Sequence, residues 1–214
     1  MTRVIIADDH AVVRNGLRHI LERASGFEVV GEASRGTEVP QLVRELSPQV
    51  ILLDLSMPGR NGLELIRQLR ADHPAVRILV LTMHAEEQYV VRAFRAGAAG
   101  YLTKESAATE LVEALRKVAS GGTYVSPAMA EKLAMGLQEK TDAPHEELSD
   151  RELEVFRRIV EGESLTQIAA ALCVSAKTIS TYKMRLMDKL QLRSDAALVR
   201  YAIEARLFGD GDNL

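Results

Sequence analysis

The stretch QVILLDL (residues 49–55) places four consecutive apolar residues, Val50 to Leu53, directly before the acidic Asp54. An apolar run without alternation is typical of a strand buried on both faces, as in a parallel sheet covered by helices. Four further stretches of the first 124 residues are similarly rich in valine, isoleucine and leucine: RVIIAD (3–8), FEVVGEA (27–33), RILVLTM (77–83) and GYLTK (100–104). Together they predict five strands.

Segments with the helical period follow each predicted strand. Apolar residues recur there at spacings of three and four, as in Val13, Leu17, Ile20 and Leu21 after the first strand. Five such repeats predict an α/β fold, a doubly wound five-stranded parallel sheet, over residues 1–124.

The pattern changes in the remaining residues. Residues 125–147 predict a linker, with a short helix beginning at Pro127 and a flexible polar segment at 138–147. Residues 148–208 predict an all-α four-helix domain, and 209–214 form an acidic tail.

Serine caps indicate where the helices of 148–208 begin. Capping patterns occur at Ser149 with Glu152, Ser164 with Gln167, Ser175 with Thr178, and at Ser194. The tight turn expected at Cys173-Val174 joins the second and third helices, which is the helix-turn-helix arrangement.

Composition excludes several classes of protein. The single cysteine, Cys173, permits neither an internal disulfide nor a thiolate metal site. A membrane-spanning helix needs ~20 apolar residues in succession, and neither such a run nor a secretory signal occurs. We therefore expect a cytoplasmic protein that does not act at a membrane.

The formal net charge of −3 conceals a cationic stripe. Between Ser175 and Arg193 the chain has five basic residues against one acid, Asp188. A polyanion responds to local charge, so this stripe is a candidate nucleic-acid contact.

Four polar positions end predicted strands: Asp8 (with Asp9), Asp54, Thr82 and Lys104. Ligands of open parallel sheets bind outside the carboxyl ends of the strands, so these side chains are expected to converge. Three clustered carboxylates repel one another by up to ~4 kcal/mol per pair at 4 Å, and oxygen ligands suit Mg²⁺. Any one of these residues alone is better explained as a polar residue that ends a strand. Because all of them stand at the carboxyl ends of predicted strands, a shared site is the better interpretation.

Residues 1–124 resemble a response-regulator receiver domain through Asp8-Asp9, DLSMPGRNG (54–62), LTMHAE (81–86) and AAGYLTK (98–104). The resemblance implies that Asp54 accepts a phosphoryl group from a sensor histidine kinase and that Lys104 pairs with this group. It also implies that Thr82 and Tyr101 form a switch pair.

The resemblance also implies a Mg²⁺ site formed by Asp9, Asp54 and the backbone carbonyl of Ser56, with Asp8 acting through water. His84 is better explained as a loop residue than as a ligand. Asn61-Gly62 is better explained as a turn before a helix than as a phosphate cradle. Glu105 stands where many receivers have proline after the lysine, often with a cis bond, so a cis bond is not assumed there.

The third helix of the C-terminal domain, SAKTISTYKMRLMDKL (175–190), has an apolar line at Ile179, Leu186 and Leu190. Its other side combines hydroxyls with cations, which suits a helix in the major groove of DNA. A solvated helix face is the alternative, and the helix-turn-helix context favours DNA.

The domain resembles the LuxR-type DNA-binding domain through LSDRELEVF (148–156), QIAAAL (167–172), VSAKTISTY (174–182) and MDKL (187–190). The resemblance implies base-facing positions at Ser180, Thr181, Tyr182 and Met184, and phosphate contacts at Lys177 and Lys183, with Arg185 beside them. Tyr182 stands where the family commonly has histidine, so packing or a phosphate contact is its alternative role.

The whole chain thus resembles a NarL/FixJ-family response regulator, which implies a transcription factor rather than an enzyme. The expected partners are a sensor histidine kinase, promoter DNA, RNA polymerase and a second copy of the chain on phosphorylation. With about eight phosphate contacts per dimer, the logarithm of the DNA affinity would fall with log[salt] at a slope near −7.

Two alternatives concern the function. The receiver could be a phosphorylation-independent dimerisation module, or the chain could be an aspartate-dependent phosphatase, which usually has a second acid where Ser56 stands. Two models also remain for signalling: shielding of the 175–190 helix by the receiver, or dimerisation through helices near 86–97 and 106–120.

Overall fold

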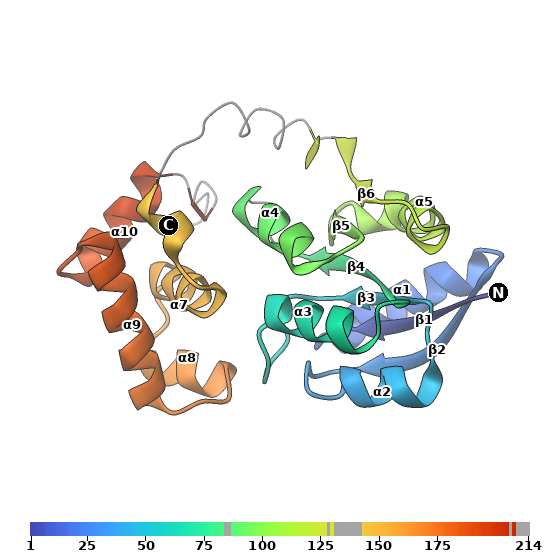
Figure 1. The fold of residues 1–214 in the computed structure, drawn as a ribbon, viewed down its shortest axis with the longest axis horizontal. Helices are drawn as coiled ribbons and strands as arrows, with labels where there is room; N and C mark the ends of the chain where they lie inside the picture. Colours follow the sequence, from blue (N-terminus) through green and yellow to red (C-terminus); the bar gives the residue numbers. More distant parts are fainter. Residues whose placement is uncertain (84–86, 128, 131–142, 206, 209–214) are drawn as a thin grey trace. The chain divides into compact units, whose positions relative to one another are not determined.

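The computed structural model describes residues 1–83, 87–127, 129–130, 143–205 and 207–208. It divides into two compact units, Met1–Leu137 and Gln138–Leu214 (Figure 1). The expected acidic tail and the first part of the expected flexible segment lie outside the described residues. The domain boundaries at 124, 147 and 208 stay predictions. No described helix is long and apolar enough to cross a lipid bilayer.

Unit 1 is a parallel sheet with helices on its faces (Figure 1), in the strand order β2-β1-β3-β4-β5-β6. The strands are β1 Thr2–Ala7, β2 Phe27–Ala33, β3 Val50–Leu53, β4 Arg77–Thr82, β5 Gly100–Thr103 and β6 Tyr124–Val125. The helices described are α1 Ala11–Arg23, α2 Val39–Leu46, α3 Gly62–Asp72, α4 Glu87–Ala96 and α5 Ala107–Ala119. The predicted doubly wound fold is confirmed.

The sheet has six strands rather than the five predicted. The additional strand, β6, has only two residues, which is too short to show a pattern in the sequence. It pairs in parallel with β5, and the Tyr124 N–H donates to the Ala99 carbonyl at 3.0 Å. The chain is thus held to the sheet edge after α5.

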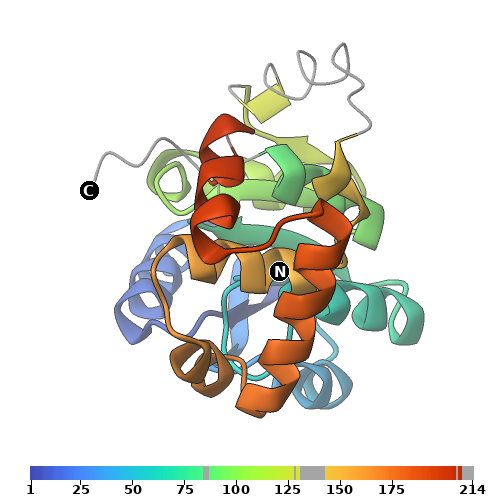
Figure 2. The ribbon, with the colours of Figure 1, turned by 90° about the vertical axis from the view of Figure 1, so that its left-hand side faces the viewer.

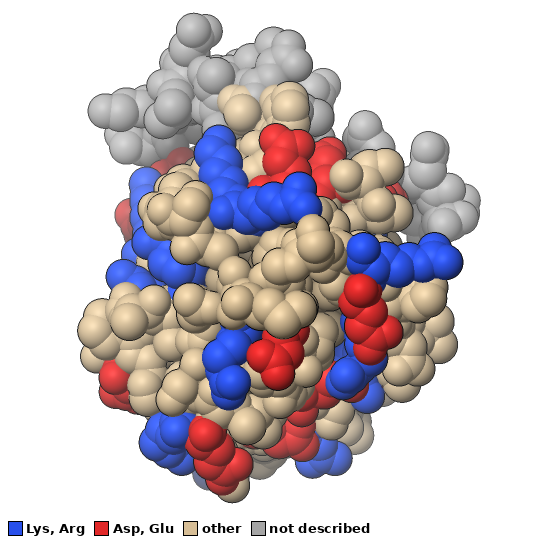
Figure 3. Space-filling view, turned by 90° about the vertical axis from the view of Figure 1, so that its right-hand side faces the viewer, with Lys and Arg blue, Asp and Glu red and all other residues tan. Residues whose placement is uncertain are grey.

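The central strands are apolar because helices cover both of their faces. All four residues of β3 are buried, as are Val4 to Ala7 of β1 and Ile78 to Thr82 of β4. In contrast, the face seen in Figure 3 has basic and acidic side chains interspersed, without a patch of one sign.

Unit 2 is helical, as predicted. Its elements are the 3₁₀ helix η1 Pro144–Glu147 and the helices α7 Asp150–Val160, α8 Leu165–Ala171, α9 Ala176–Leu190 and α10 Asp195–Glu204. The four serine caps are all confirmed, and the first two form complete capping boxes. The last four residues of the predicted flexible segment, 144–147, therefore form a turn of 3₁₀ helix.

A four-residue turn joins α8 to α9, which runs along α7 and α8 and faces the viewer with α10 in Figure 2. Cys173 in this turn has a positive φ of 54°. The predicted apolar line of α9 is confirmed, since Ile179, Leu186 and Leu190 are buried. The opposite side of α9 is therefore turned away from the core of the unit.

The surroundings of Gly62 and Gly16 predict that substitution by alanine has opposite effects on stability at these two positions. A Cβ on Gly62, the first residue of α3, would lie 2.6 Å from the backbone Cα of Leu55, whereas a Cβ on Gly16 in α1 would meet nothing within 4 Å. We expect Gly62→Ala to destabilise unit 1 by about 1–3 kcal/mol, and Gly16→Ala to stabilise it by about 0.5–1 kcal/mol. Urea denaturation of both variants checks this, and equal effects would contradict it.

Candidate phosphoacceptor site and DNA-binding helix

The polar residues predicted to converge do lie at one edge of the sheet. Asp8 follows β1 and Asp54 follows β3, which are neighbouring strands, and the Asp54 N–H donates to the Ala7 carbonyl at 2.9 Å. On the next two strands, the Lys104 N–H donates to the Thr82 carbonyl at 2.8 Å. The backbone pairing of the sheet therefore sets the positions of all four residues.

The two buried carboxylates share one cation. The Lys104 Nζ lies 2.7 Å from Asp54 Oδ2 and 2.7 Å from Asp8 Oδ2, and each carboxylate side chain is only 2% exposed. The second oxygen of each carboxylate accepts from a backbone N–H two residues later, that of His10 for Asp8 (2.8 Å) and that of Ser56 for Asp54 (3.1 Å). Each aspartate is thus fixed from both sides.

Burial governs the pKa values of this cluster. It raises the pKa of the Asp54 carboxyl, and the hydrogen bonds from Lys104 and the Ser56 N–H offset only part of the rise. Burial alone would lower the pKa of the Lys104 ammonium, but the Asp54 and Asp8 carboxylates outweigh it and raise that pKa. Lys104 is therefore cationic at neutral pH.

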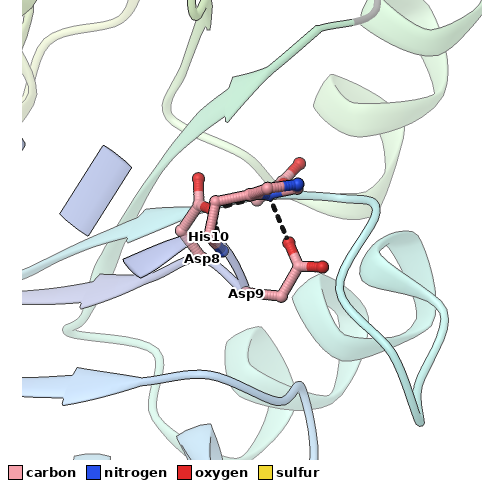
Figure 4. A group of neighbouring side chains, drawn as sticks. Asp8, Asp9 and His10 are labelled. Carbon is pink, nitrogen blue, oxygen red and sulfur yellow. Dashed lines mark hydrogen bonds and ion pairs between the residues drawn. The ribbon is translucent and has the colours of Figure 1, made fainter. Parts of the chain in front are cut away.

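Asp9 is more exposed and lies beside His10, a residue that the sequence analysis did not single out. The His10 Nδ1 lies 2.9 Å from Asp9 Oδ1 and 3.3 Å from Asp8 Oδ1 (Figure 4). The His10 side chain is 66% exposed, so it lies on the side of the cluster that faces solvent. The position of His10 directly after Asp8-Asp9 is the feature of the sequence that could have indicated its place in the cluster.

The donor set fits a hard divalent cation. Ligand atoms of Asp8, Asp9, His10 and Asp54 all lie within 4.8 Å of one another. Three carboxylates face one ammonium there, which leaves two negative charges to be balanced, and carboxylate oxygens are ligands that Mg²⁺ accepts. The imidazole of His10 is the member of the group that does not suit Mg²⁺.

The remaining predicted residues of unit 1 have different environments. Thr82 at the end of β4 and Tyr101 in β5 are almost completely buried, and Tyr101 is the register partner of Val80. Asn61 caps α3 by accepting from two backbone N–H groups, as predicted for a turn before a helix. His84 lies outside the described residues. No described peptide bond is cis, and this includes the bond between Lys104 and Glu105.

The predicted DNA-contacting residues of α9 are accessible to different degrees. Lys177, Ser180, Met184 and Arg185 are exposed, whereas Thr181, Tyr182 and Lys183 are half-buried. Ser180 and Thr181 both donate their hydroxyl hydrogens to carbonyls of their own helix at 3.0 Å. Because these bonds use the hydroxyl hydrogens, the two oxygens can act as acceptors towards a ligand.

Two of the five cations in the stripe are engaged within unit 2. The Lys183 Nζ lies 2.5 and 2.7 Å from the two carboxylate oxygens of Asp195. The Lys189 Nζ lies 2.7 Å from Glu152 Oε2 and 3.0 Å from the Glu147 carbonyl. The other three, Lys177, Arg185 and Arg193, form no ion pair with described residues, so the stripe is weaker than the sequence count indicates.

Comparison with known proteins agrees with this geometry. Residues 4–116 match the response regulator receiver domain, and residues 146–202 match the luxR family of bacterial regulatory proteins. The response regulator GacA of Pseudomonas protegens is 40% identical over 204 residues, which are 95% of this chain and 96% of GacA. The chain belongs to the NarL/FixJ family of response regulators.

Other members of the family match over nearly their whole length. The response regulator UvrY of Escherichia coli is 40% identical over 205 residues, which cover 95% of this chain and 94% of UvrY. A solved structure of RcsB from Salmonella typhimurium is 33% identical, with a TM-score of 0.73 and coverage of 95% of this chain and 97% of RcsB. With a receiver domain and a domain of the luxR family of bacterial regulatory proteins, this response regulator is a transcription regulator rather than an enzyme.

Glu152 predicts a pH-dependent contribution to the stability of unit 2. Burial raises the pKa of this carboxyl, but the hydrogen bonds from Lys189 and Ser149 outweigh burial and hold it below the usual 4.5. A lowered pKa in the folded state means that the stabilisation is present above pH 4.5 and is lost as the pH falls through the folded value.

We expect Glu152→Gln to lower the free energy of unfolding by about 1–2 kcal/mol at pH 7, and by less below about pH 4. The matched control is Glu161→Gln, which removes a half-exposed ion pair with Arg157 and is expected to change stability by less than about 0.5 kcal/mol. Denaturation curves at several pH values check this. A difference between wild type and Glu152→Gln that persists unchanged at low pH would contradict the argument.

Proposed function

We propose that this response regulator binds promoter DNA under the control of a phosphoryl group on Asp54, which a sensor histidine kinase supplies. The observation that carries the proposal is the buried Asp54 carboxylate with the Lys104 ammonium 2.7 Å from Oδ2. A carboxylate held beside a fixed cation can act as a nucleophile towards phosphorus, forming an aspartyl phosphate as the bond to the donor group breaks.

The residues of the pocket have separate roles in this proposal. Lys104 moves from the carboxylates to the oxygens of the phosphoryl group, whose charge of about −2 attracts it more strongly. Asp9, Asp54 and the Ser56 carbonyl would hold Mg²⁺, with Asp8 acting through water, and the ion would supply charge neutralisation. Thr82 and Tyr101 respond as the switch pair.

The output is binding of α9 in the major groove. Ser180, Thr181, Tyr182 and Met184 face bases, while Lys177, Lys183 and Arg185 contact phosphates. Solved structures of RcsB include an RcsB–DNA complex and two RcsB dimers bound to parallel DNAs, which supports DNA binding and dimerisation for this relative of RcsB.

The proposed setting is the cytoplasm, with a homodimer that recruits RNA polymerase once phosphorylated. The phosphorylation-independent alternative would need no acidic pocket. Here Asp8, Asp54 and Lys104 are all in contact, which favours control by phosphorylation.

Acetyl phosphate with Mg²⁺ is expected to add one phosphoryl group to the wild-type chain and none to Asp54→Asn, as measured by intact-protein mass spectrometry. Asp72→Asn, which changes an exposed acid at the end of α3, is the matched control and retains labelling. Persistent labelling of Asp54→Asn would exclude Asp54 as the acceptor.

Three cations of α9 and the following loop, which form no ion pair with described residues, predict the salt dependence of DNA binding. Lys183 is paired with Asp195 and is not counted as a full phosphate contact. Lys177, Arg185 and Arg193 then give a dimer about six phosphate contacts, so the plot of log K against log[salt] should have a slope near −5 rather than −7. Fluorescence anisotropy with labelled duplex DNA at several KCl concentrations measures this slope. A slope near zero would contradict binding through these cations.

A further inference from the structure

The two internally paired lysines of α9 are bound in different ways. Lys189 reaches Glu152, whose side chain is only 4% exposed, and the Glu147 carbonyl, so it connects three elements of unit 2. Lys183 instead reaches Asp195, whose side chain is 58% exposed. The first lysine is thus paired with a buried carboxylate, whereas the second is paired with an exposed one.

Asp195 is not required to begin α10. Ser194 caps this helix, because its hydroxyl oxygen accepts from the Ala197 N–H at 3.2 Å. Asp195 is the first helical residue, and its carboxylate is directed to the Lys183 ammonium of α9. Its chief polar contact in the described structure is therefore with a predicted DNA-contacting residue.

We propose that Asp195 is an intramolecular competitor of DNA phosphate for the Lys183 ammonium, and that this competition lowers the affinity for DNA. The inference rests on the proposed binding of DNA by α9. The Lys183 ammonium cannot form a close ion pair with the Asp195 carboxylate and with a DNA phosphate at the same time. Lys183 therefore contributes to DNA binding only to the extent that its ion pair with Asp195 is broken.

The ion pair between Lys183 and Asp195 can be broken by DNA, yet its strength is sufficient to change the DNA affinity measurably. Exposed ion pairs change an equilibrium only by a factor of about one to five, and salt screens them. DNA presents a dense row of phosphates that can displace a single exposed carboxylate. The competition acts on every DNA sequence alike, because phosphate contacts carry no sequence information.

The test is a double-mutant cycle in the full chain, with Asp195→Asn, Lys183→Gln and the double variant. DNA affinity is measured by fluorescence anisotropy on a mixed-sequence duplex of about 40 base pairs, long enough for two half-sites. Asp195→Asn is expected to tighten binding by roughly two- to fivefold per protomer and to steepen the salt slope by about 0.9 per protomer.

The Lys183→Gln background separates competition from general repulsion. There, Asp195→Asn is expected to leave the salt slope unchanged and to give only the small gain of Glu204→Gln, which removes the same charge at the other end of α10. Equal tightening by Asp195→Asn in both backgrounds would overturn the competition while leaving the DNA interface standing. No salt-dependent binding by the wild type would instead contradict the proposed interface itself.

Discussion

The arrangement of unit 1 depends on one ammonium held between two buried carboxylates. Lys104 extends from the end of β5 across β4 to Asp54 and Asp8, which follow β3 and β1. Neither carboxylate could remain charged at this depth without a cation, because burial of an unpaired charge is strongly unfavourable. A phosphoryl group on Asp54 adds negative charge to a cluster in which one ammonium already serves two carboxylates. The ion pairs of Lys104 must therefore change when Asp54 is phosphorylated.

In unit 2, too, a buried carboxylate is paired with a lysine, and this ion pair holds a helix in place. Lys189 joins α9 to the buried Glu152 at the start of α7, while Ile179 and Leu186 fill the core beneath the helix. These contacts fix which side of α9 faces outward. The exposed side then combines hydroxyl oxygens with the cations Lys177 and Arg185, which is a surface suited to the DNA backbone.

The sequence predicted features that are set by local pattern or by the topology of parallel sheets. The apolar run before Asp54, the serine caps and the convergence of strand-end residues all belong to this group. Features that depend on contacts between distant side chains were not accessible: Lys183 with Asp195 and Lys189 with Glu152 lie 12 and 37 positions apart. The strand β6 was missed because two residues show no periodicity, and His10 because its contacts with Asp8 and Asp9 require the turn after β1.

The affinity of the full chain for DNA, measured before and after stoichiometric phosphorylation, tests the link between the two units most directly. Control by Asp54 predicts that phosphorylation tightens DNA binding in the wild type and that acetyl phosphate has no effect on Asp54→Asn. The same dissociation constant for the phosphorylated and unphosphorylated wild-type chain would contradict it, and would make the receiver a module that acts independently of phosphate.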